Sequence, residues 1–135
     1  MTGRLDLTEL FFSSAGRLSR APFLVSGAVL LLAAWVYEAV APPPARWITG
    51  WVVYPFLAFC AVSVTAKRLH DRGHNGWWAA PLLIALLVEW NASAPAVLRV
   101  LFALMLVWGA VELGLMPGEP GANRFGPNPL RPAAA

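Results

Sequence analysis

The chain has 135 residues, of which 59% are hydrophobic and only 13% are charged. Soluble domains carry about 25% charged residues, and small folds expose much of their surface, so this composition argues against a soluble protein. The formal net charge of +3 is too small to indicate nucleic-acid binding. The single cysteine, Cys60, excludes a disulfide framework.

The N-terminal segment, residues 1–21, mixes aromatic residues with arginines ahead of the first apolar run. It predicts a short helix at the membrane interface; the alternative is a cationic tail that only sets topology. Arg17 and Arg20, followed by an apolar run and Ala39-Val40-Ala41, imitate a secretory signal peptide. Because the run has membrane-spanning length, we expect a retained anchor instead.

Three apolar segments have the length of a membrane span. A span requires about 20 apolar residues, because a rise of about 1.5 Å per residue must cover about 30 Å of hydrocarbon. Residues 22–41 and 47–66 meet this length, and residues 96–116 meet it despite Arg99 and Glu112. We expect all three to be transmembrane helices.

A fourth segment, residues 77–94, is weaker, since its continuous apolar run stops at Val88. Short apolar runs are also typical of re-entrant or interfacial segments, so whether this segment fully spans stays open. We favour four crossings. Pro42-Pro43-Pro44 and residues 91–95 make the connections between paired spans very short, which predicts tight antiparallel hairpins. The predicted fold is all-α: one integral membrane domain, residues 1–135, with four transmembrane helices as two antiparallel hairpins.

The distribution of Lys and Arg predicts the orientation, because short cytoplasmic loops are enriched in them. With four spans, eight basic residues share one side, and only Arg46 and Arg99 lie on the other. The eight are Arg4, Arg17, Arg20, Lys67, Arg68, Arg72, Arg124 and Arg131. We therefore expect an N-in/C-in protein, with residues 1–21, 67–76 and 117–135 in the cytoplasm.

The stretch KRLHDRGHNGWW, residues 67–78, raises the question of a metal site. His70 and His74 are four residues apart, the spacing at which two histidines of one helix share a zinc ion. Gly73 and Gly76 break the helix that this spacing requires, and no third ligand is evident. We expect no metal, no cofactor and no catalytic residue here.

The same stretch is better interpreted as a topological anchor. Lys67 and Arg68 end the second helix, where the helix dipole favours cations. Asp71 lies between Arg68 and Arg72, which predicts an ion pair with one of them or with an arginine of the N-terminal segment. The alternative is binding of anionic lipid headgroups, which basic clusters attract by about 1 kcal/mol per residue.

Charged residues in or near the spans are costly and commonly functional. Glu38, Glu89 and Arg99 map near the outer boundary, where Glu89 and Arg99 flank one turn and can pair. Glu112 maps near the inner boundary, within reach of Arg68 or Arg72. None lies near the midplane, where a proton-coupled transporter needs its carboxylate. This position makes a transporter the less favoured function. The alternative that we retain is a small oligomeric transporter that uses Glu38, Glu89 or Glu112.

The tail from Pro117 contains five prolines and three glycines, which exclude regular helix or strand. Phe125 amid these turns indicates that the tail folds back onto the inner face of the protein; disorder is the alternative.

Three motifs occur in order: Gly16-Arg17-Leu18-Ser19-Arg20 with Phe23, then residues 67–78, then residues 117–129. Together they resemble small bacterial inner-membrane proteins that are grouped only as a domain of unknown function, over nearly the whole chain. Leu24 stands where that family favours tryptophan, and Asn75 where serine is common. The resemblance implies the bacterial inner (plasma) membrane and names no substrate.

We expect a non-enzymatic membrane protein in which a polar cap on the inner face binds a partner protein or anionic lipid headgroups. A homo-oligomer is a further prediction. The residues assigned to the cap are Arg17, Arg20, Lys67, Arg68, His70, Asp71, Arg72, His74, Asn123 and Arg124.

Overall fold

The computed structural model describes residues 6–90 and 93–131; within them all regular secondary structure is helical, and an isolated bridge joins Asn123 and Gly126. In chain order the elements are α1 (Leu7–Phe12), α2 (Arg20–Val40), α3 (Pro43–Asp71), the 3₁₀-helix η1 (Gly76–Trp78), α4 (Ala79–Trp90), α5 (Ala96–Gly109) and the π-helix η2 (Ala110–Leu115). The predicted all-α class is confirmed.

Local signals explain where several helices begin. Asp6 caps α1, since its side chain accepts a hydrogen bond from the Thr8 amide at 2.9 Å. Pro43 lies in the first turn of α3, and Pro95 immediately precedes α5. Proline suits these positions because its φ is preset for a helix and the first helical amides have no intrahelical acceptor.

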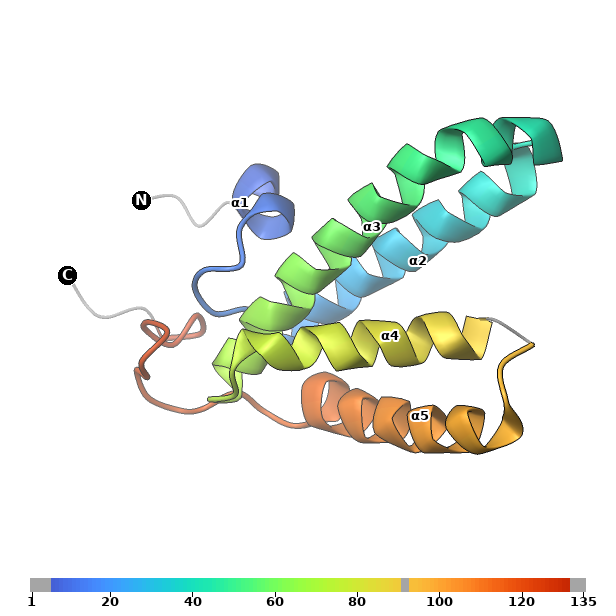
Figure 1. The fold of residues 1–135 in the computed structure, drawn as a ribbon. Coiled ribbons are helices and arrows are strands. Elements are labelled where there is room, and N and C mark those ends of the chain that lie inside the picture. Colours follow the sequence, from blue (N-terminus) through green and yellow to red (C-terminus); the bar gives the residue numbers. More distant parts are fainter. Residues whose placement is uncertain (1–5, 91–92, 132–135) are drawn as a thin grey trace.

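The four long helices form two antiparallel pairs, α2 with α3 and α4 with α5 (Figure 1). The pairs meet at the end where the α3–α4 connection lies, and they diverge toward the other end (Figure 1). Helix α1 and the C-terminal tail lie at the end where the pairs meet. The predicted cap segments therefore come together at one end of the molecule.

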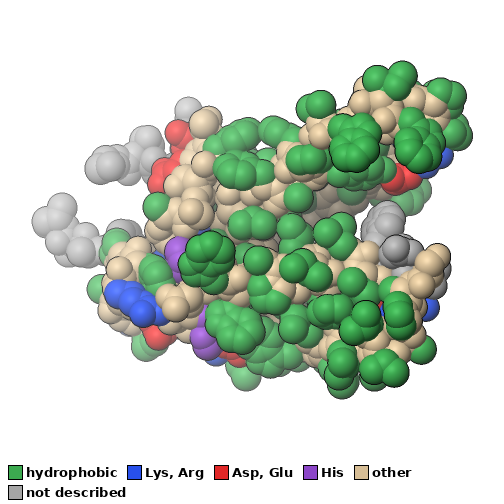
Figure 2. Space-filling view, viewed as in Figure 1, with side chains coloured by type: hydrophobic (Ala, Val, Ile, Leu, Met, Phe, Trp, Pro, Cys, Tyr) green, Lys and Arg blue, Asp and Glu red, His purple; other side chains and the backbone are tan. Residues whose placement is uncertain are grey.

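Tight packing is concentrated at this end. One buried cluster contains Ala66, Leu69, Ala79, Leu82 and Leu113. A second contains Leu10, Leu18 and Val64. Elsewhere the helices expose large apolar side chains, and Figure 2 shows these covering the visible face between two polar ends. Helices that are apolar on all sides are typical of membrane spans.

Three helices are long and apolar enough to cross a membrane: Arg20–Val40, Pro43–Asp71 and Ala96–Leu115. They indicate that the protein is membrane-associated. The remaining apolar helix, Gly76–Glu89, is shorter, so the fourth crossing and the complete hairpin topology stay predictions.

Helix α3 differs most from expectation. It starts at Pro43 and ends at Asp71, so it extends beyond the predicted span, residues 47–66, at both ends, and it continues for three residues past Lys67 and Arg68, which were expected to end it. The physical reason is that Lys67 and Arg68 find acceptors within the protein, so the helix continues without exposing their charges. The short helix predicted within residues 1–21 is confirmed as α1.

Candidate functional site: the polar cap

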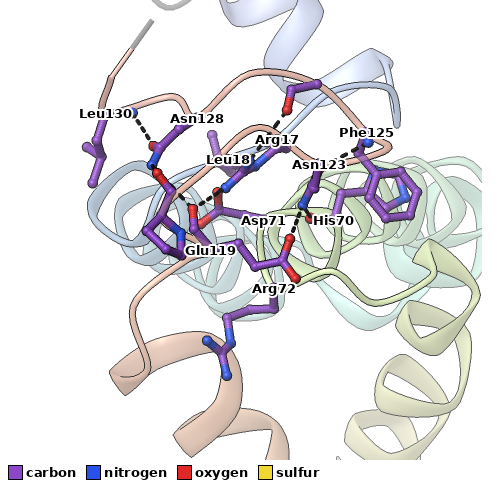
Figure 3. A network of polar contacts seen from close by, with 12 residues as sticks. Arg17, Leu18, His70, Asp71, Arg72, Glu119, Asn123, Phe125, Asn128 and Leu130 are labelled. Carbon is purple, nitrogen blue, oxygen red and sulfur yellow. Dashed lines mark hydrogen bonds and ion pairs between the residues drawn. The ribbon is translucent and has the colours of Figure 1, made fainter.

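Asp71, at the C-terminal end of α3, lies between the guanidinium groups of Arg17 and Arg68. Figure 3 shows the contact with Arg17. Its Oδ1 accepts from Arg17 Nε at 3.0 Å, and its Oδ2 pairs with Arg68. The exposed fractions of the three side chains are 1% for Arg17, 0% for Arg68 and 3% for Asp71. A buried ion pair stabilises a fold only when its remaining hydrogen-bond donors also find acceptors. The contribution of this cluster to stability therefore depends on the other contacts of Arg17 and Arg68.

Backbone carbonyls satisfy those donors. Arg68 donates from Nε to the Leu113 carbonyl at 2.8 Å and from Nη2 to the Met116 carbonyl at 2.6 Å. Arg17 donates from Nη2 to the Glu119 carbonyl at 2.7 Å. The two arginines thereby tie the end of η2 and the tail to the end of α3.

The tail folds back over α3, as predicted. Asn123 Nδ2 donates to the His70 carbonyl at 2.9 Å and to Glu119 Oε2 at 2.6 Å. The Phe125 ring stacks on the His70 imidazole with centroids 3.9 Å apart (Figure 3). The Glu119 amide donates to the Asp71 carbonyl at 2.8 Å. These contacts hold a segment without regular secondary structure in one conformation.

A second charged group lies at the edge of the cap. Glu112 Oε1 lies 2.7 Å from Arg72 Nη2 and 3.2 Å from His74 Nε2. The predicted reach from Glu112 to Arg72 is therefore confirmed. His74 and Trp108 also contribute to a pocket of about 370 Å³.

Lys67 connects the cap to α1. Its side chain is buried, and Nζ donates to the carbonyls of Glu9 and Leu10, the latter at 3.2 Å. These carbonyls belong to the last four residues of α1, whose carbonyls have no amide partner within the helix.

Two exposed arginines complete the group. Arg20 Nη1 donates to the Leu115 carbonyl at 3.0 Å. Arg124 donates to Asn75 Oδ1 at 2.9 Å, and its guanidinium lies 4.6 Å from the centroid of the Phe125 ring. All ten residues predicted for the cap therefore lie at the same end of the molecule and contact one another or neighbouring segments there.

Comparison with known proteins assigns the chain to a family. The family model described as "Protein of unknown function (DUF805)" matches residues 11–127. The chain belongs to the DUF805 family. It is similar to "Uncharacterized protein YiiR" of Escherichia coli strain K12, with 30% identity over 147 residues that cover 90% of this chain and 89% of that protein. The protein of the same name from Escherichia coli O157:H7 matches equally. No solved structure matches.

The DUF805 match includes every cap residue. Within that stretch, His70 and His74 serve different contacts: His70 Nδ1 lies 3.1 Å from the Gly16 carbonyl, whereas His74 reaches Glu112. Helix α3 ends before His74, and Gly73 has a φ of 74°. Among residues 6–90 and 93–131, no group of three or more His, Cys, Asp or Glu side chains is placed to hold a metal ion.

Sequence reasoning missed Glu119 as a member of the cap. Its carbonyl accepts from both Arg17 and Asn128, and its carboxylate accepts from Asn123. The available signal was that Glu119 is the only acidic residue after Pro117.

Proposed function

We propose that this DUF805 protein is a non-enzymatic, polytopic protein of the bacterial inner membrane whose cap, on the cytoplasmic side, binds a partner protein. The observation that carries this proposal is the use of two buried arginines, Arg17 and Arg68, to fix the shape of the tail.

Lipids and protein partners differ in what they require of a binding surface. Fixing a Pro- and Gly-rich segment costs about 1–2 kcal/mol of backbone entropy per residue. Anionic lipid attracts basic segments through charge and does not require a surface of fixed shape. Protein recognition does depend on shape complementarity. A tail held by Arg17, Asn123 and Phe125 therefore suits a protein partner better.

The lipid alternative is weakened because the relevant cations are already paired. Arg17 and Arg68 donate to Asp71 and to carbonyls, and Arg72 pairs with Glu112. Among the described basic residues of the cap end, Arg20, Arg124 and Arg131 remain exposed, which is a small number for a headgroup-binding surface.

The charge balance supports a cytoplasmic cap. Among the described residues, the cap end has seven basic and five acidic side chains, and the opposite end has two of each. The residues of the cap end are Arg17, Arg20, Lys67, Arg68, Arg72, Arg124 and Arg131 with Asp6, Glu9, Asp71, Glu112 and Glu119; those of the opposite end are Arg46 and Arg99 with Glu38 and Glu89. The surplus of basic residues agrees with the positive-inside rule.

The transporter alternative would use Glu38, Glu89 or Glu112. Glu112 pairs within the cap, whereas Glu38 and Glu89 pair with Arg46 and Arg99 at the opposite end. This separation into two ends favours the cap proposal.

Site-specific photo-crosslinking in living cells tests the proposal. A photoreactive residue replaces Leu130, which is 75% exposed on the tail, and the matched control replaces Val40, which is 75% exposed at the opposite end. We expect one protein adduct of defined mass from position 130, identifiable by mass spectrometry, and its loss when Arg17→Gln releases the tail. Lipid adducts only, or the same adduct from position 40, would contradict a partner-binding cap.

A further inference from the structure

The end of the molecule opposite the cap carries a pocket of about 570 Å³ between α2 and the N-terminal half of α3. Glu38 reaches it from α2, and Arg46, Trp47, Trp51 and Tyr54 line it from α3. Its volume lies within the range of about 300–1,000 Å³ that is usual for ligand pockets.

An ion pair forms the polar part of this pocket. Glu38 Oε2 lies 2.5 Å from Arg46 Nη1, and Glu38 Oε1 accepts a hydrogen bond from the Tyr54 hydroxyl. The exposed fractions are 33% for the Arg46 side chain and 29% for that of Glu38. The two charges are thus fixed relative to one another and still reachable by a ligand.

Aromatic residues hold this geometry. The Tyr54 ring packs edge-on against Tyr37, with centroids 5.5 Å apart. Gly50 allows the Tyr54 ring to lie close to the helix, since a Cβ at position 50 would be 3.0 Å from its Cε2 atom. The Tyr54 hydroxyl is thereby directed at Glu38 rather than into the solvent.

Two tryptophans form the apolar wall. Trp47 and Trp51 are one helical turn apart on α3 and are 76% and 79% exposed. Tryptophan is enriched where the hydrocarbon of a bilayer meets its headgroups. The pocket therefore combines a pair of opposite charges with aromatic surface of the kind that is enriched beside a lipid's glycerol and upper acyl chains.

We propose that this pocket binds the phosphoethanolamine headgroup of a zwitterionic phospholipid in the leaflet opposite the cap, with the phosphate on Arg46 and the ammonium on Glu38. Because the pair of Glu38 and Arg46 has no net charge, a simple anion or a simple cation is attracted by one of its members and repelled by the other. A zwitterion aligned antiparallel to the ion pair meets an opposite charge at both ends.

The choice of a primary ammonium follows from hydrogen bonding. An –NH₃⁺ group has three donors that a carboxylate such as Glu38 can accept. A trimethylammonium group has no N–H donor. Phosphatidylethanolamine is therefore expected to bind better than phosphatidylcholine, although both lipids are zwitterionic.

The same end of the molecule provides a matched control. Glu89 and Arg99 form an ion pair at 4.0 Å between α4 and α5, and neither residue lines this pocket. Changing this second pair alters the charge of the same end without touching the proposed site.

Native mass spectrometry tests the proposal on the full-length protein, reloaded from an equimolar mixture of phosphatidylethanolamine, phosphatidylcholine and phosphatidylglycerol. We expect the wild type to retain phosphatidylethanolamine by about fivefold over each of the others. Glu38→Gln leaves Arg46 without its acid, so the preference shifts to the anionic phosphatidylglycerol. Arg46→Gln loses the phosphate contact and all preference. Glu89→Gln keeps the wild-type preference.

Equal retention of the three lipids by the wild type overturns the proposal, whether or not any variant folds. A loss of preference in Glu89→Gln equal to that in Glu38→Gln also overturns it, because the effect then belongs to the charge of the whole end. A competition arm separates lipid from soluble ligand: displacement of the lipid by soluble glycerophosphoethanolamine at a comparable concentration overturns the lipid assignment. No displacement supports the role of Trp47 and Trp51 as a wall for the apolar part.

Discussion

The backbone of Gly118 lies against the carboxylate of Asp71, so closely that a Cβ at position 118 would overlap the carboxylate. The next residue, Glu119, donates its amide to the Asp71 carbonyl at 2.8 Å. The tail therefore crosses the C-terminal end of α3 in contact with Asp71. It can do so only because residue 118 has no side chain.

Gly118→Ala should destabilise the protein by about 1–3 kcal/mol, the usual cost of forcing extra volume into a packed site. Gly121→Ala is the matched control, because nothing lies within 4 Å of a Cβ placed there. Denaturant unfolding in a mild detergent, followed by circular dichroism, measures both variants. Equal stabilities for the two variants would show that the tail does not press against Asp71 in the membrane protein.

Asp71→Asn should cost more, about 3–5 kcal/mol, because it leaves Arg17 and Arg68 buried without their counter-charge. Asp6→Asn serves as the control, since Asp6 is exposed and asparagine caps a helix equally well. The same unfolding measurement applies. A loss of stability below about 0.5 kcal/mol, as is usual at surface sites, would mean that water screens the charges of Asp71, Arg17 and Arg68.

Phe125→Ala should release the tail without unfolding the helices, because it removes the stack on His70 and the surface under Arg124. Stacked aromatic pairs contribute about 0.5–1.5 kcal/mol beyond their buried area. We expect faster hydrogen exchange at the amides of residues 123–126, with exchange in α2 and α3 unchanged.

Leu130→Ala is the control for tail release, since Leu130 is 75% exposed. It should leave exchange at residues 123–126 unchanged. Faster exchange in this control, equal to that in Phe125→Ala, would count against the stack as the contact that holds the tail.

Single cysteines should reveal whether α4 crosses the membrane. In a Cys60→Ala background, we expect a membrane-impermeant maleimide to label Asn75→Cys only from the cytoplasmic side and Ala94→Cys only from the opposite side. The two positions flank η1 and α4 in the chain. Labelling of both from the same side would support a re-entrant or interfacial segment and would remove the fourth span.

Much of the fold could be predicted because it depends on local signals. Apolar length predicts α2 and α5, and prolines at 42–44 and 95 mark where one helix ends and the next begins. Opposite charges predict that Asp71 pairs with Arg68, Arg72 or an arginine of the N-terminal segment, and Asp71 pairs with Arg68 and Arg17. Phe125 in a polar tail predicts a fold-back contact, which the stack on His70 confirms.

The rest of the cap depends on hydrogen bonds to backbone carbonyls. Because every residue has a carbonyl, these acceptors cannot be identified from the sequence. The sequence places Lys67 and Arg68 at the end of a helix, but their burial depends on the carbonyls of Leu10 and Leu113 beside them. The Leu113 acceptor lies in the π-helix η2, and single turns of π-helix have no strong sequence signal to set against the surrounding α pattern. For this reason the buried contacts of Lys67 and Arg68 could not be predicted.

The unequal lengths of the helices have a consequence for the surrounding bilayer. Helix α4 has 12 residues and η1 adds three, which together reach about 24 Å across a hydrocarbon layer of about 30 Å. A crossing by this segment imposes hydrophobic mismatch on one flank of the protein, while α3, with 29 residues, is long enough for any bilayer. Lipids beside α4 must then compress, at a cost of fractions of a kcal/mol per Å. The protein should accordingly concentrate where the membrane is thinnest.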